Sequence, residues 1–356
     1  MWSAGFRPFF LLASAWAAIA VPVWLAAYAH GYVLRGTLPA MFWHAHEMVF
    51  GFGMAAVAGF LLTAIPNWTG RLPVRGRPLA LLAMLWLAGR IAMLVPGAAL
   101  LDLAFSAALI VVVARELLAG RNWRNLPMLG ALALLFAGNL LFHLGIYAGL
   151  RLGIATLCML IALVGGRIVP SFTRNWLAKK QPRAPLPAPE GWLDRGALLL
   201  TFFALAAWVC ELATWPAILA GLALAARLSR WRGLATVREP LLFVLHLGYA
   251  WLALGLILLG LEAPAALHAL TVGAVGTMTL AVMTRASLGH TGRALVADAA
   301  TVTIYALVTL AVLLRLASPF TGAQAVLVAS LSGMAWSAAF ATFALHYGRF
   351  LVQKKT

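Results

Sequence analysis

The chain has 356 residues, of which 64% are hydrophobic and only 10% are charged, with a mean hydropathy of +0.96. A soluble globular protein carries about 25% charged residues, so this composition excludes a water-soluble protein. Lys and Arg outnumber Asp and Glu by 26 to 9. In a soluble chain this excess indicates nucleic-acid binding, whereas in a membrane protein it sets how the chain is oriented across the membrane. The two cysteines, Cys158 and Cys210, lie in separate apolar stretches, which excludes a disulfide framework and a thiolate zinc site.

Apolar stretches of about 20 residues, the length of a membrane span, recur along the whole chain. They predict an all-α polytopic membrane protein, a single integral membrane domain over residues 1–356 with about twelve transmembrane helices. The predicted spans are 6–29, 42–65, 78–95, 97–118, 125–148, 150–172, 195–213, 214–230, 240–260, 263–285, 297–317 and 322–346. A Pro-rich cytoplasmic linker, 173–195, separates a first six-helix half, 1–172, from a second, 196–356.

The basic residues fall almost entirely in alternate connections between these spans. With the amino terminus inside, 21 Lys and Arg lie in cytoplasmic connections or at the termini, four lie on the outer side, and Arg167 lies within the sixth span. Because cytoplasmic loops of membrane proteins carry the excess of Lys and Arg, both termini are predicted to be cytoplasmic. The charge is therefore a topology signal, and the expected partner is the lipid bilayer rather than nucleic acid.

Ionisable groups inside spans are costly and are therefore candidates for function. Four histidines share the outer third of the predicted membrane: His44, His46, His143 and His268. His246 lies nearer the cytoplasmic side, and His290 lies at the inner surface. Imidazole binds haem iron and copper without burying a charge. A lone transmembrane histidine also serves as a hydrogen-bond bridge between helices, and for His143 and His246 both interpretations stay open.

The second predicted span begins with His44-Ala45-His46-Glu47. Residues two apart on an α-helix point about 200° apart, so His44 and His46 are expected to serve different partners. Glu47 is three residues from His44 and shares its face, so we expect its carboxylate to orient the His44 imidazole.

Spans two and ten carry the same pattern. His46, Gly51 and Thr69-Gly70-Arg71 recur as His268, Gly273 and Thr291-Gly292-Arg293, with offsets of five from His to Gly and 23 from His to Thr. Span six carries a partial copy, in which Pro170 to Thr173 matches Pro66 to Thr69. The spacing of four spans predicts three pseudo-repeats of four helices.

This plan resembles the large catalytic subunit of haem–copper oxidases and nitric oxide reductases, in which helices two and ten supply histidines to a haem near the outer face. By this fold-level analogy, His46 and His268 are the candidates for axial ligands of one haem. The sequence departs from the oxidases elsewhere, because span six has no His and span seven has no His-His pair. A haem–copper centre of the oxygen-reducing kind is therefore not expected.

Several motifs resemble one family more specifically. They are GFRPFF at 5–10, WHAHEM at 43–48, GFLLTAIPNWTG at 59–70, and the stretches 166–175 and 284–292. Together they are similar to the NnrS family over nearly the whole chain. The resemblance implies a bacterial inner-membrane protein that contains haem and copper and acts in denitrification and in protection against nitric oxide and nitrosative stress.

With these cofactors implied, haem b is assigned to His46 and His268. His44 is the best candidate for copper, with His143 and His246 as further candidates for a second metal site. The supporting residues are Glu47, Arg167 and His290. Arg167 follows Gly165-Gly166, and because a buried Arg needs an anionic partner, a haem propionate and a protein carboxylate both stay open.

Three functions follow from these residues. The leading one is binding of nitric oxide or a related small ligand, and whether a redox reaction is catalysed stays open. The sequence has no Cys-x-x-Cys-His motif, so electrons would come from quinone or a separate donor. The alternatives are a twelve-helix transporter of a metal or small anion, which predicts paired halves, and a haem-binding sensor without turnover.

Overall fold

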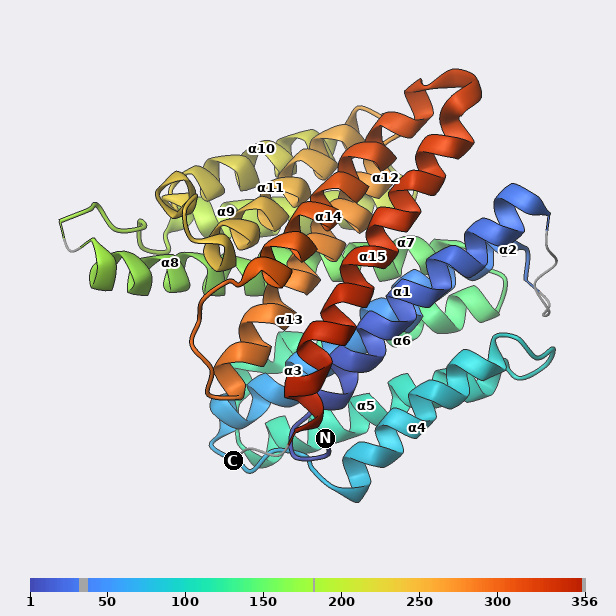
Figure 1. Ribbon diagram of the computed structural model, residues 1–356, viewed down its shortest axis with the longest axis horizontal. Coiled ribbons are helices and arrows are strands. Elements are labelled where there is room, and N and C mark those ends of the chain that lie inside the picture. Colours follow the sequence, from blue (N-terminus) through green and yellow to red (C-terminus); the bar gives the residue numbers. More distant parts are fainter. Residues whose placement is uncertain (32–37, 182, 354–356) are drawn as a thin grey trace. The chain divides into compact units, whose positions relative to one another are not determined.

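A computed structural model describes residues 1–31, 38–181 and 183–353 of the chain. These residues form helices joined by turns and short loops and contain no strand (Figure 1). Because lipid offers no hydrogen-bond partner, an apolar chain that crosses a membrane must bond its backbone groups internally, and the helix does this within one segment. The all-α prediction is confirmed.

The helical segments follow the predicted spans closely. In the first half of the chain they are α1 (Phe6–His30), α2 (Ala40–His46), η1 (Glu47–Gly53), α3 (Met54–Thr69), α4 (Arg77–Ala92), α5 (Ala99–Ala119), η2 (Trp123–Asn125), α6 (Leu126–His143), α7 (Ala148–Leu160), η3 (Ile161–Gly165) and α8 (Gly166–Lys180). Those that follow are α9 (Trp192–Val209), α10 (Pro216–Ser229), η4 (Gly233–Thr236), α11 (Pro240–Gly260), α12 (Ala266–His268), η5 (Ala269–Gly276), α13 (Thr277–His290), α14 (Ala299–Ala317), η6 (Ser318–Phe320), η7 (Gly322–Gln324) and α15 (Ala325–Val352). Consecutive segments such as α2, η1 and α3 form one continuous helix.

Within the described ranges, nine continuous helices are long and apolar enough to cross a membrane. Three predicted spans fall short of that standard. At 1.5 Å per residue, the 16 residues of α4 and the 14 of α10 extend about 24 and 21 Å, against an apolar thickness of about 30 Å. Helix α5 is long enough but carries Asp102, Arg115 and Glu116. The structure supports a polytopic membrane protein, and the count of twelve crossings stays a prediction.

The Pro-rich connection is shorter than the sequence suggested. Helix α8 continues to Lys180 and α9 begins at Trp192, so residues 173–180 of the predicted linker are helical. The basic residues at the end of α8, Lys179 and Lys180, interact favourably with the partial negative charge of its last turn. The division into two six-helix halves stays a prediction.

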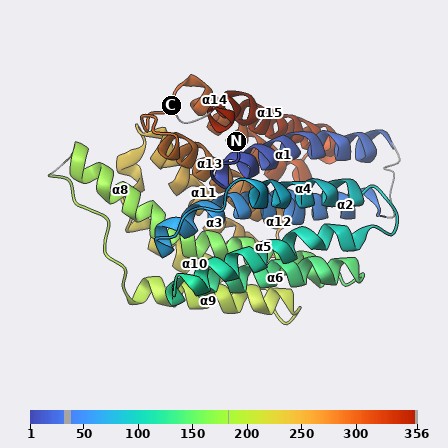
Figure 2. The same cartoon turned by 90° about the horizontal axis from the view of Figure 1, so that it is seen from below.

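The chain forms two compact units. Unit 1 comprises Met1–Thr156, Ala286–Arg293 and Trp336–Thr356, and unit 2 comprises Leu157–Arg285 and Ala294–Ala335. In unit 1, α1 packs on α2, η1 and α3, while α5 packs on α3, α4 and α6 (Figure 2). In unit 2, α10 lies between α9 and α11, and α11 also packs on η5. Close helix contact there uses small residues: a Cβ on Gly221 of α10 would lie 2.5 Å from the Ala253 carbonyl oxygen of α11.

Two π-helical segments begin at equivalent places in spans two and ten. Segment η1 starts directly after His46, and η5 starts directly after His268. A π segment inserts an extra residue into a helical turn and is frequent at functional sites. The third π segment, η3, does not align with the partial copy in span six.

The ends of these two spans are also alike. The hydroxyl of Thr69 donates to the Ile65 carbonyl, and that of Thr291 donates to the Ser287 carbonyl. Gly70 and Gly292, one residue further on, have φ values of 69° and 74°, which only glycine adopts without strain. These likenesses support a relation between spans two and ten, and the arrangement of three sets of four helices stays a prediction.

Arg7 joins the first and last helices of unit 1. Its side chain is 3% exposed, and Nη1 donates to the carbonyl oxygens of Phe350, Leu351 and Gln353 at 3.3, 2.9 and 2.5 Å. These carbonyls lie at the carboxyl end of α15, where the last turn of a helix leaves acceptors without partners. The start of α1 and the carboxyl end of α15 therefore lie side by side (Figure 1).

We expect Arg7→Ala to destabilise the protein, because the carbonyls at the end of α15 lose a charged donor. Hydrogen bonds to charged groups contribute about 1.5–3 kcal/mol, and a loss of this size will appear as a lower thermal unfolding midpoint in detergent. Arg349→Ala, which removes an exposed charge from the same helix end, is the matched control and is expected to change the midpoint little.

Candidate metal centre

A group of buried polar side chains gathers in unit 1 where the sequence predicts the outer face. Five helical segments contribute to it. The members are His46 at the end of α2, Glu47 at the start of η1, Arg90 of α4, Asp102 of α5, and Asn139 and His143 of α6. We call these six residues the Arg90 cluster. Five of the six are at most 4% exposed, and His143 is half-buried.

Arg90 lies between two carboxylates. Its Nη1 donates to Glu47 Oε2 at 2.6 Å, and its Nη2 donates to Asp102 Oδ1. Removing one partner from a buried ion pair leaves an unpaired charge, at a cost of about 3–5 kcal/mol. Each member of this triad therefore requires the other two, and together they join η1, α4 and α5.

His46 has an oxygen atom near each ring nitrogen. Nδ1 lies 3.1 Å from Glu47 Oε1, and Nε2 lies 2.9 Å from Asn139 Oδ1 and 3.2 Å from Asp102 Oδ2. The Asn139 amide in turn donates to the same Asp102 oxygen at 2.8 Å. The ring is thus held in one orientation, with Nε2 directed at the carboxylate of Asp102.

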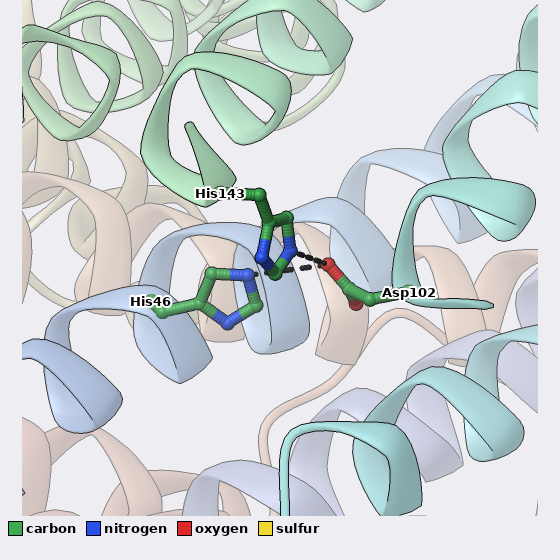
Figure 3. Close-up of side chains that lie close together, drawn as sticks. All are labelled: His46, Asp102 and His143. Atoms are coloured by element: carbon green, nitrogen blue, oxygen red, sulfur yellow. Dashed lines mark hydrogen bonds and ion pairs between the residues drawn. The ribbon is translucent and has the colours of Figure 1, made fainter. Parts of the chain in front are cut away.

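His143 approaches the same carboxylate from the end of α6. Its Nε2 lies 3.0 Å from Asp102 Oδ2, so both imidazoles converge on one oxygen (Figure 3). One ligand atom from each of His46, Asp102 and His143 lies within 4.8 Å of the others. Two imidazoles and a carboxylate at this separation are a donor set that first-row transition metals accept.

Two glycines allow the elements to come this close. A Cβ on Gly51 of η1 would lie 2.5 Å from Arg90 Nη1 and 2.9 Å from Glu47 Oε2, and a Cβ on Gly89 would lie 3.0 Å from Asp102 Oδ1. The Gly51 carbonyl also accepts a hydrogen bond from Trp86 Nε1 at 3.0 Å. Gly51, which the sequence singled out by its repeat spacing, thus provides the space in which the triad fits.

A pocket of about 190 Å³ reaches the cluster from outside. Its lining includes Met93 and Gly97 of the α4–α5 connection, Phe142 and His143 of α6, and Tyr147 beyond that helix. His143 therefore borders both the pocket and the carboxylate of Asp102. A small molecule can approach the cluster there without unfolding a helix.

The structure gives His44 and His46 different surroundings, as their spacing predicted. The His44 ring stacks on Trp24 of α1, with centroids 4.1 Å apart and an interplanar angle of 22°. Glu47 was predicted to orient His44, whereas the structure places its carboxylate on His46 and Arg90. The reason is the guanidinium of Arg90, which lies across from the start of η1 and attracts the carboxylate.

The remaining predicted histidines are not members of the Arg90 cluster. His246 of α11 is 4% exposed and its Nε2 pairs with the Thr173 hydroxyl at 2.9 Å, a bridge between helices. His290 is exposed, and its ring lies 5.5 Å from that of Phe6. His268 belongs to unit 2, so its pairing with His46 as ligands of one haem stays a prediction.

Arg167, which the sequence placed in the interior of a span, is exposed. The buried arginine of this region is Arg227 of α10, which donates to Asp194 Oδ1, to the Ala162 carbonyl and to the Tyr249 hydroxyl. Its guanidinium lies against Gly166, where a Cβ would be 2.4 Å away. Arg167 follows Gly166 by about 100° of helix rotation and so points away from this buried group.

Three members of the Arg90 cluster are missing from the site residues that the sequence predicts: Arg90, Asp102 and Asn139. Arg90 is one of the four basic residues that the sequence places on the outer side, yet its side chain is 4% exposed. Asn139 was not considered, although a lone amide in an apolar helix needs a partner. One signal in the sequence could have indicated the pair. Arg90 and Asp102 lie on either side of one short turn, so that two neighbouring helices can pair their opposite charges.

Apolar helices around a buried, charged His and carboxylate cluster define a polytopic membrane protein with a candidate metal centre. The chain belongs to the NnrS family, whose pattern it matches over residues 1–355. No curated protein matches the chain.

We expect Gly51→Ala to disrupt the Arg90 cluster, because the new methyl group would overlap Arg90 and Glu47. Overpacking of a buried site costs about 1–3 kcal/mol, which thermal unfolding in detergent will detect. Gly130→Ala in α6 is the matched control, since a Cβ there meets no atom within 4 Å. That change is expected to be neutral or stabilising, because Ala favours the helix. Equal effects of the two substitutions would contradict the packing described for Gly51.

Proposed function

We propose that this NnrS-family protein binds copper at His46, Asp102 and His143 and acts in the bacterial inner membrane in the response to nitric oxide. The observation that carries the proposal is the convergence of three ligand atoms within 4.8 Å in a buried site. The family supplies the biological setting. Catalysis of a redox reaction is not needed for the proposal.

The charge of the cluster favours a monovalent cation. With Glu47 and Asp102 ionised, Arg90 charged and both imidazoles neutral, the formal charge of the cluster is −1. A net charge buried at membrane depth is costly, so one added positive charge stabilises the site. Either a proton on His46 or a Cu(I) ion brings the net charge of the cluster to zero, whereas a divalent ion brings it to +1. Imidazole is a good ligand for copper.

The surrounding residues have separate roles in this site. Glu47 would hold the His46 ring through Nδ1, leaving Nε2 for the metal, and Arg90 would hold the carboxylate of Asp102. Such contacts to ligands orient them and typically change metal affinity by about 10–100-fold. When bound, the metal would supply a coordination position for a small molecule. His143, at the pocket, lies where that molecule arrives.

The predicted haem b ligation by His46 and His268 competes with the copper site, because both use His46. His46 Nε2 faces Asn139 and Asp102, so haem ligation through this atom requires both contacts to be replaced. Because one ring nitrogen cannot bind both metals, the two assignments exclude each other at Nε2. The proposal also includes twelve membrane crossings with both termini in the cytoplasm. His44 and His246 are further metal candidates, and quinone or a separate protein is the proposed electron donor.

The test is the copper and iron content of the purified full-length protein, with its optical spectrum. We expect His143→Ala to lower the copper affinity at least tenfold, because it removes one of three ligands. His346→Ala, on α15 and outside the cluster, should leave the affinity unchanged. Unaltered copper binding by His143→Ala would refute the site.

The spectrum separates the two uses of His46. If copper occupies the cluster, His46→Ala lowers copper binding, and any haem Soret band stays as in the unsubstituted protein. If His46 and His268 hold haem, His46→Ala and His268→Ala each alter the Soret band, while His143→Ala leaves it unchanged. The second result would show that His46 is a haem ligand and not a copper ligand.

A further inference from the structure

A second pocket in unit 1 is lined by arginines and lies where helices end. Its volume is about 460 Å³, and it is bordered by the segment after α3, the start of α4 and the carboxyl-terminal half of α5. The charged lining residues are Arg71, Arg75, Arg115 and Glu116. We call this the Arg71 pocket. The predicted topology puts it on the cytoplasmic side, at the membrane surface.

The pocket carries an excess of positive charge. Arg71 Nε donates to Glu116 Oε2 at 2.7 Å, and this pair fixes one arginine in place. Arg115 Nε lies 3.9 Å from Glu116 Oε1, and the Arg115 side chain is 77% exposed. Arg75 has no ion-pair partner among the described residues. Three arginines and one glutamate give a net charge of +2. The start of α4, reached through Pro78, adds the partial positive charge of a helix amino terminus.

The rest of the lining is apolar. Pro73, Val74, Pro78 and Val112 line the pocket together with Leu72, which is 77% exposed. A soluble anion gains nothing from such a surface, whereas a lipid presents a charged phosphate and an acyl chain together. Basic pockets between transmembrane helices on the cytoplasmic side are known sites for anionic lipid headgroups.

We infer that the Arg71 pocket binds the phosphate of an anionic phospholipid, with Arg75 and Arg115 as the residues that contact it. Arg71 is already paired and shapes the wall, and the apolar lining receives the start of the acyl chain. Each arginine near a membrane surface contributes about 1 kcal/mol of attraction to anionic lipid. Loss of both contacts therefore corresponds to an affinity about 30-fold weaker. The inference is independent of the metal centre.

The experiment uses the full-length protein in mild detergent, freed of lipid, and native mass spectrometry with added phosphatidylglycerol, phosphatidylcholine or inorganic phosphate. Phosphatidylglycerol is expected to bind more tightly than phosphatidylcholine. The double variant Arg75→Ala/Arg115→Ala should bind phosphatidylglycerol about 30-fold more weakly. The control Arg124→Ala/Lys180→Ala removes two exposed charges outside the pocket and should bind it as the unsubstituted protein does.

A second variant tests the apolar part without changing charge. Val112→Trp fills the pocket and should weaken phosphatidylglycerol binding while both arginines remain. Equal binding of the two lipids, or full phosphatidylglycerol affinity in the double arginine variant, would overturn the inference. Binding of inorganic phosphate as tight as that of phosphatidylglycerol and insensitive to Val112→Trp would assign the pocket to a free anion and would also overturn it.

Discussion

The interaction on which unit 1 depends is the bridge that Arg90 makes between Glu47 and Asp102. It joins three helical segments through buried charges, and its two carboxylates also position His46 and His143. In such a place each charge is tolerable only while its partners remain. The packing around it follows from that requirement: Gly51 and Gly89 leave room for the guanidinium and the Asp102 carboxylate. Stability and candidate chemistry therefore reside in the same residues.

The π segment after His46 belongs to the same arrangement. By inserting an extra residue, it changes the direction of the side chains on either side of it, so Glu47 meets Arg90 and Gly51 lies beneath the guanidinium. The second π segment, after His268, gives unit 2 a similar local structure. Unit 2 has its own buried charge group, in which Arg227 pairs with Asp194 and with a carbonyl of the third π segment. Buried arginines thus organise both units, with different partners.

The two ends of unit 1 differ in chemistry. One end holds the Arg90 cluster and the small pocket beside His143. The other holds the Arg71 pocket and the helix ends that Arg7 connects. This polarity agrees with the distribution of basic residues along the sequence, which places arginines in the loops of one side. The two proposals therefore concern opposite ends of unit 1: a small ligand at the Arg90 cluster and a lipid phosphate at the Arg71 pocket.

The sequence by itself determined the all-α class and the helical segments to within a few residues at most ends. These properties depend on local composition, because a long apolar stretch favours a helix and Pro and Gly end it. Tertiary structure alone decided that Arg90 is buried, that Glu47 contacts His46, that Asn139 joins the cluster and that Arg167 is exposed. Each of these outcomes depends on which helix faces which, and a charged side chain takes its position from a partner far away in the sequence.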